Sequence, residues 1–143
     1  MVILTDTNII IDYLRSQDKQ KTLFHRLFYI EDNLPAINLS IITEIWQGKS
    51  MSEKKELNFV EKLLEGFNIY LSNIDIAKKT GEILRESRYQ IDFQDAEIVA
   101  CALYHNLPLL TKNTKDFKKI KGLKLFDYQF SKVEVSPTGR PSS

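Results

Sequence analysis

The stretch Val2-Ile-Leu-Thr-Asp-Thr-Asn8 decides the fold of this chain. Its first four residues are apolar or β-branched with no polar alternation, which is typical of a strand buried on both faces. Strands of this kind occur almost only in parallel sheets that are covered by helices on both sides. The strand runs directly into Asp6, so the sequence predicts a carboxylate at the carboxyl edge of the sheet.

Outside this strand, apolar segments of strand length alternate with segments of helical spacing. Further strands are predicted at 35–39, 67–71, 107–111 and 123–128. Helices are predicted from just after Asp6-Thr7-Asn8 through Leu14, at about 18–30, after a cap at Ser40, around 57–64, from Ser72-Asn73 to about 88, and from 92–94 to about 106, with a helical turn at 116–120. Right-handed crossovers between parallel strands then imply an α/β fold, a three-layer α/β/α sandwich with a central parallel sheet of about four to five strands.

Composition narrows the class of protein. The 143 residues include 20 Lys and Arg against 19 Asp and Glu, a net charge of +1 that excludes a binder acting through bulk positive charge. The length predicts one domain over residues 1–130, followed by a polar, disordered tail over 131–143. The lone Cys101 has no disulfide partner, no apolar run could span a membrane, and the start of the chain lacks a basic signal-peptide region. We therefore expect a soluble cytoplasmic domain that does not contact the membrane.

Four acids from distant parts of the chain are expected at one edge of the sheet. Asp6 and Asp116 follow predicted strands, whereas Glu44 and Asp95 are expected in the first turns of helices that begin at the same edge. Taken singly, each acid is equally well explained as a helix cap. Crowded together, four carboxylates need a compensating cation or a proton. If the compensation is a cation, oxygen ligands select Mg²⁺ or Mn²⁺. One or two such ions would suit hydrolysis of a phosphodiester.

Other polar residues carry weaker predictions. Asp12 and Asp92 are interpreted as solvated or locally hydrogen-bonded, although Asp92 lies close to Asp95 in the sequence. Residues 111–124 hold six lysines and one acid, a local charge of +5 that leaves −4 for the remainder. This segment either contacts a nucleic-acid backbone, through Lys112, Lys115 and Lys118, or forms a solvated surface.

Four segments together resemble the PIN-domain endoribonucleases of the VapC type, the toxins of VapBC toxin–antitoxin pairs. They are Leu4-Thr-Asp-Thr-Asn-Ile9, Ser40-Ile-Ile-Thr-Glu-Ile45 with Gly48 after it, Asp95-Ala-Glu-Ile-Val-Ala-Cys-Ala102, and Leu110-Thr-Lys-Asn-Thr-Lys-Asp-Phe117. The likeness covers about residues 2–128. The four motifs in this order are more specific than the opening Asp-Thr-Asn triplet alone.

The resemblance assigns roles to these residues. It implies that Asp6, Asp95, Asp116 and Glu44 are the catalytic, metal-binding acids, and that the side chains supporting them are Asn8, Thr111 and Asn113. It also implies Mg²⁺- or Mn²⁺-dependent cleavage of RNA, often transfer RNA, as well as a homodimer and neutralisation by a small antitoxin protein. With metal-activated water as the nucleophile the product carries a 5′ phosphate. A 2′,3′-cyclic phosphate would instead require attack by the RNA 2′-OH.

Three other classes of protein compete with this interpretation. A haloacid-dehalogenase-like phosphatase needs a second acid two residues after the first, where this chain has Asn8. A response-regulator receiver needs a phosphorylatable Asp, and residues 46–52 contain none. A non-catalytic nucleic-acid- or protein-binding module on the same fold stays open as the alternative, with the acids acting only as helix caps.

Overall fold

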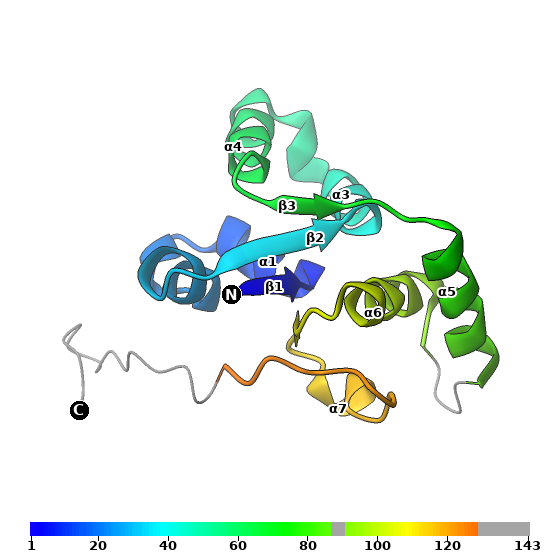
Figure 1. The fold of residues 1–143 in the computed structure, drawn as a ribbon. Coiled ribbons are helices and arrows are strands. Elements are labelled where there is room, and N and C mark those ends of the chain that lie inside the picture. The colour runs from blue at the N-terminus through cyan, green and yellow to red at the C-terminus, as the bar shows by residue number, and fades with distance from the viewer. Residues whose placement is uncertain (87–90, 129–143) are drawn as a thin grey trace, which may run out of the picture.

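The computed structural model describes residues 1–86 and 91–128 (Figure 1). In chain order the elements are β1 (Val2–Thr5), α1 (Thr7–Arg15), η1 (Lys19–Lys21), α2 (Leu23–His25), η2 (Arg26–Ile30), β2 (Leu34–Asn38), α3 (Leu39–Trp46), η3 (Lys49–Ser52), α4 (Lys54–Leu64), β3 (Asn68–Tyr70), α5 (Ile74–Glu86), α6 (Phe93–His105), β4 (Leu109–Leu110) and α7 (Thr114–Phe117). No helix among these residues is both long and apolar enough to cross a membrane.

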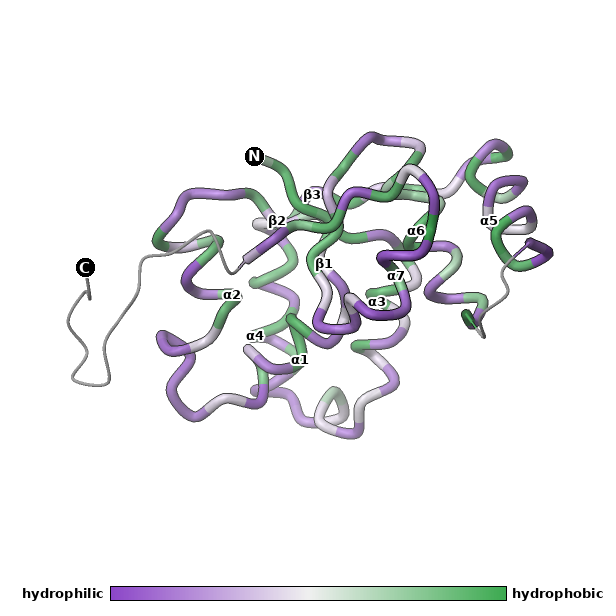
Figure 2. The backbone as a smooth tube through the Cα atoms, turned by 90° about the horizontal axis from the view of Figure 1, so that it is seen from below, coloured by the Kyte–Doolittle hydropathy of each residue, from purple (hydrophilic) through white to green (hydrophobic). Residues whose placement is uncertain are grey.

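The four strands form one parallel sheet in the order β3-β2-β1-β4. Strands β2 and β3 are added in turn on one side of β1, and β4 then pairs with the other side of β1. Right-handed crossovers place the helices of the first two connections on one face of the sheet and α5 and α6 on the other. Figure 2 shows α1, α2 and α4 gathered on one side of the strands. The predicted α/β/α sandwich with a parallel sheet is confirmed.

The core lies on both faces of β1, the central strand. Ile3 and Leu4 are fully buried, and helices on both faces supply further fully buried side chains, among them Ile10 and Ile98. The middle of helix α6, from Ala96 to Ala102, is largely buried, and the helix packs against α5 and α3. Burial of both faces explains why β1 carries no polar alternation.

The segment expected as one helix over about 18–30 is divided into η1, α2 and the π-helical η2. Thr22 is the physical reason. Its hydroxyl donates to the carbonyl oxygen of Lys19 (2.6 Å) and accepts from the N–H of His25 (3.2 Å). A threonine that bonds the backbone in this way ends one helical segment and caps the next.

Two other boundaries differ from the sequence prediction. Helix α3 is capped by Asn38, whose Oδ1 accepts from the N–H of Ile41 (3.1 Å), and not by Ser40. The expected last strand at 123–128 is reduced to a single parallel bridge between Leu125 and Leu109. The tail at 131–143 and the expected end of the fifth helix at residue 88 lie outside the described residues.

Phe117 connects the fold to the site because it anchors the short helix α7. It is only 1% exposed, whereas Phe93 at the start of α6 is 62% exposed. We expect Phe117→Ala to lower the free energy of unfolding by about 3–5 kcal/mol, since it leaves a large cavity in the core. Phe93→Ala is the matched control and should change it by less than about 0.5 kcal/mol. Urea denaturation measures both, and equal losses would show that α7 is not held by this side chain.

Candidate active site

Asp6 is the innermost acid of the site. It follows β1 directly, acts as the N-cap of α1, and is only 7% exposed. Its Oδ1 accepts from the N–H of Thr7, and its Oδ2 accepts from the hydroxyl of Thr111, both at 2.7 Å. Thr111 reaches Asp6 because β4 pairs with β1 and the two strands end side by side. Both carboxylate oxygens are therefore held by neighbours from opposite ends of the chain.

Glu44 faces Asp6 from α3. The sequence predicted it in the first turn of its helix, and this placement is wrong, because the helix begins at Leu39 and Glu44 falls in the second turn. Its Oε1 accepts from the hydroxyl of Thr7 (2.8 Å). Thr7 thus binds two acids at once, Asp6 through its backbone and Glu44 through its side chain. Sequence reasoning did not assign Thr7 a role, and its place immediately after Asp6 was the only available signal.

Helix α6 contributes two acids from its start. Asp95 lies in the first turn and is half-buried. Asp92 is the N-cap and accepts from the N–H of Asp95 at 2.8 Å, as expected of a locally hydrogen-bonded residue. Its charge nevertheless acts on Asp6, Glu44 and Asp95. Asp92 therefore belongs to the acid cluster, which the sequence analysis suggested only through its closeness to Asp95.

Asp116 completes the cluster from the exposed helix α7. Its Oδ2 accepts from the side-chain amide of Asn113 (2.9 Å), and the backbone N–H of Asn113 donates to the Thr111 hydroxyl oxygen (3.1 Å). The same Thr111 hydroxyl binds Asp6. The loop after β4 therefore supports two of the acids through one connected set of hydrogen bonds.

Repulsion among the acids appears in their proton affinities. Burial is the main cause that raises the pKa of Asp95 to about 6, and the charges of Asp92, Asp6, Glu44 and Asp116 raise it further. Burial likewise raises the pKa of Asp6 and that of Glu44, against the lowering effect of their hydrogen bonds with Thr111 and Thr7. The fold thus places four other carboxyl groups close enough to Asp95 to oppose its ionisation.

The donor set at this edge fits a hard cation. All five acids offer oxygen ligands, which Mg²⁺ and Mn²⁺ prefer, and a bound cation would relieve their repulsion. The side-chain oxygen of Asn8 is also buried and accepts no hydrogen bond from the described residues. Within residues 1–86 and 91–128, no three His, Cys, Asp or Glu side chains stand in a ready ion-binding group. Mg²⁺ keeps several of its waters, which would bridge the remaining gaps.

The lysines expected to bind nucleic acid differ in their surroundings. Lys115 and Lys118 are exposed on and just after α7. Lys112 instead forms an ion pair with Asp12 of α1, so neither residue is simply solvated as the sequence suggested.

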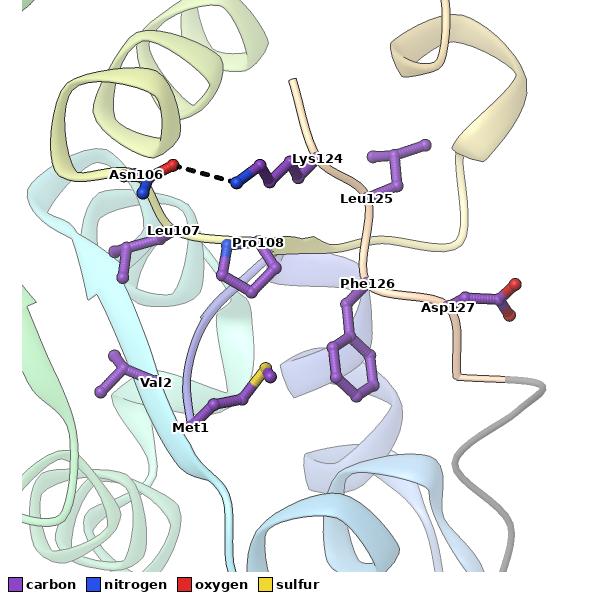
Figure 3. A pocket seen from close by; sticks show the side chains of 9 residues that line it. All are labelled: Met1, Val2, Asn106, Leu107, Pro108, Lys124, Leu125, Phe126 and Asp127. Carbon is purple, nitrogen blue, oxygen red and sulfur yellow. Dashed lines mark hydrogen bonds between the residues drawn. The ribbon is translucent and has the colours of Figure 1, made fainter. Parts of the chain in front are cut away.

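A pocket of about 570 Å³ lies at the other edge of the sheet, where β1 and β4 begin (Figure 3). Its lining includes Met1, Pro108 and Phe126 and none of the five acids. The candidate chemistry and this cavity therefore occupy opposite ends of the strands.

Replacing Asp95 by Asn is expected to stabilise the metal-free protein at neutral pH. The raised pKa means that the folded protein binds this proton more tightly than the unfolded chain, whose pKa is near 3.8. The stability contributed by Asp95 is fully present below about pH 4 and is lost as the pH rises through about 6. Asn carries no charge and avoids that loss.

In EDTA at about pH 7.5, the free energy of unfolding of Asp95→Asn should exceed that of the parent by about 1–2 kcal/mol, after allowance for solvent screening. The difference should shrink below about pH 4. Asp75→Asn is the matched control, because Asp75 is an exposed acid in the first turn of α5 and lies outside the cluster. Thermal melts in both variants test this, and a lower melting temperature for Asp95→Asn would contradict it.

Comparison with known proteins agrees with the fold. The family model described as PIN domain matches residues 3–123. Ribonuclease VapC1 of Methanocaldococcus jannaschii is 32% identical over 130 residues, which are 87% of each chain. Ribonuclease VapC of Rickettsia bellii is 31% identical and covers 87% of this chain and 95% of its own.

Among solved structures, a toxin–antitoxin complex from Klebsiella pneumoniae superposes with a TM-score of 0.66 at 30% identity, over 85% of this chain and 94% of that one. The four motifs, the parallel sheet and the acids at its carboxyl edge thus coincide with a family match over most of the chain. This chain belongs to the PIN-domain family, and its relatives are VapC proteins.

Proposed function

We propose that this chain is a Mg²⁺- or Mn²⁺-dependent endoribonuclease that acts as the toxin of a type II toxin–antitoxin pair. The observation that carries the proposal is the cluster of five acids at the carboxyl edge of a PIN-domain sheet, with three raised pKa values. The relatives that are 30% or more identical bear the name ribonuclease. Perturbed carboxylates that converge from separate elements are typical of catalytic sites.

Asp6, Glu44, Asp95 and Asp116 would hold the cation or pair of cations. When bound, Mg²⁺ or Mn²⁺ would lower the pKa of the attacking water and neutralise charge on the phosphate in the transition state. Asp92 adds negative charge beside Asp95. The chain itself supplies the placement of these oxygens, which must be held to within a fraction of an ångström for efficient catalysis.

That placement depends on two threonines. Thr7 fixes Asp6 and Glu44 relative to each other. Thr111 fixes the second oxygen of Asp6 and, through Asn113, the position of Asp116. Because a threonine hydroxyl donates a hydrogen bond without carrying a charge, these residues can orient acids without adding a charge that would compete with a metal ion. We assign Thr7, Thr111 and Asn113 as positioning residues.

The partners follow from the relatives. The Klebsiella pneumoniae neighbour is a toxin–antitoxin complex, and we propose a small antitoxin protein as the partner of this chain as well. Transfer RNA as the substrate and a homodimer as the active assembly stay predictions. Apolar side chains that are exposed near the site, Leu39, Leu71, Ile74 and Phe93, offer a surface that a second copy could cover.

Cleavage of RNA tests the proposal directly. Purified protein, free of antitoxin, should make discrete cuts in end-labelled small RNA with Mn²⁺ and none with EDTA. Asp6→Asn removes the central ligand and should lower the rate at least 100-fold, the order of loss seen when a central catalytic electrostatic group is removed. Asp75→Asn, the same change on the exposed surface of α5, should cleave like the parent.

The chemical groups at the ends of the cleaved RNA provide a second test of the mechanism. Products with a 5′ phosphate agree with attack by water. A 2′,3′-cyclic phosphate would overturn the metal-dependent mechanism. Absence of any cut, by folded protein with Mn²⁺ present and no antitoxin bound, would favour the non-catalytic binding module.

Metal binding should also be visible without RNA. A ligand that binds only the folded state stabilises it, by about 2.7 kcal/mol at a hundredfold excess over the dissociation constant. We therefore expect saturating Mn²⁺ to raise the melting temperature of the parent and to have little effect on Asp6→Asn. A melting curve that Mn²⁺ leaves unchanged in the parent, or shifts equally in both proteins, would argue against a site at these acids.

A further inference from the structure

The positive charge of this protein is concentrated on one short segment. Residues 111–124 carry a local charge of +5, although the whole chain is only +1. The segment begins at the carboxyl end of β4, includes α7 with its site residue Asp116, and runs on to Lys124. In Figure 2 the chain around α7 is mostly purple, the colour of hydrophilic residues.

Five of the six lysines of this segment fall into two groups, and the sixth, Lys119, already interacts within the protein. Lys112 pairs with Asp12, and the ammonium of Lys124 lies 3.5 Å from the side-chain oxygen of Asn106 at the edge of the pocket in Figure 3. These two side chains have partners within the protein. Lys115, Lys118 and Lys121 are exposed and have no hydrogen bond or ion pair within the described part of the chain. We call these three residues the α7 lysines.

The α7 lysines lie on the same segment of chain as Asp116, one of the five acids. Lys115 directly precedes Asp116, and Lys118 follows it by two residues. A helical rise of about 1.5 Å per residue separates Lys115 and Lys118 by about 4.5 Å along the axis. Phe117 lies between these two lysines in the sequence, and its buried side chain holds α7 against the core. All three lysines lie within five residues of Asp116 in the sequence, so a strand whose phosphate is bound at Asp116 passes close to the segment that carries them.

An acid cluster of this kind repels a polyanion. Five carboxyl groups meet at the site, so an RNA strand approaches it against a negative potential unless cations lie close by. Lysines next to the cluster offset that repulsion for the phosphates that flank the reacting one. Contacts of this type act on the backbone and carry no base specificity.

We propose that Lys115, Lys118 and Lys121 bind the backbone phosphates of the RNA strand on the side of the scissile bond next to α7. This inference rests on the proposed function, since it takes RNA as the ligand. It excludes Lys112, which the sequence suggested for the same role, because Asp12 already neutralises it. The α7 lysines set affinity for RNA of any sequence, and the position of the cut is decided elsewhere.

A matched pair of triple variants tests the proposal. The first is Lys115→Ala/Lys118→Ala/Lys121→Ala. The second, Lys54→Ala/Lys55→Ala/Lys62→Ala, removes the same charge from exposed lysines of α4. Helices α4 and α7 lie at opposite ends of the molecule in Figure 1. Both sets of changes are made in the Asp6→Asn protein, so that RNA is bound without being cut.

Binding of a short fluorescein-labelled polyuridine is followed by anisotropy across a salt series. Each phosphate contact on a single strand contributes about 0.7 to the slope of log affinity against log salt. The α7 variant should therefore lose about 2 from that slope and bind more than tenfold more weakly at 0.1 M salt. The α4 variant should keep the slope of its parent. Equal losses in both variants, or no loss in the α7 variant, would overturn the proposal.

A cleavage assay in the catalytically competent chain separates this proposal from the proposed function. The same three α7 changes should raise KM for RNA, leave kcat within about threefold and leave the cut positions unchanged, because phosphate contacts are independent of sequence. Salt-dependent binding through the α7 lysines without cleavage by the parent would support the binding surface and overturn the nuclease. Cleavage by the parent with no change in KM in the α7 variant would overturn the surface alone.

Discussion

The carboxylate of Asp6 is the point on which the site depends. One of its oxygens is bound by the residue that follows it and the other by Thr111, which lies 105 residues further along the chain. This second contact exists only because β4 returns to pair with the central strand β1. Every other acid of the cluster is positioned relative to Asp6, through Thr7, through Asn113, or by the direction in which its helix begins.

Holding five acids together opposes stability. The raised pKa of Asp95 means that the fold opposes ionisation of this group, whereas a hard-cation site needs it ionised. The fully buried residues of β1 and α6, among them Leu4 and Ile98, supply the apolar burial that offsets this repulsion. Natural active sites often show such a conflict, because the geometry that suits a charged ligand is strained in its absence.

Charge distribution separates the two parts of the proposed RNA interaction. Four of the five acids lie at the end of β1, in α3 and at the start of α6, and the fifth, Asp116, lies on α7. The α7 lysines lie on one short helix and the turn after it, and so reach toward solvent. The first arrangement suits chemistry at a single phosphate, and the second suits weaker contacts with several. A net charge of +1 gives no hint of this separation, because it is the balance of all 20 basic and 19 acidic residues of the chain.

The sequence by itself determined the class of fold and most of the site. Strand β1 was predicted with its exact bounds, because burial on both faces removes polar alternation. Asp6 was placed at the carboxyl edge because it directly follows this strand. The order of strands and helices then led to a parallel sheet. These features depend on the pattern of apolar and polar residues over a few neighbouring positions, and that pattern is visible in the sequence alone.

Tertiary structure decided the contacts between distant segments. Glu44 reaches Asp6 from the second turn of its helix, Thr7 binds both acids, Asp92 acts on three others, and Asp12 captures Lys112. None of these relations has a signature in local periodicity. Each arises because neighbouring parallel strands end at one edge and bring side chains together that are far apart in the chain.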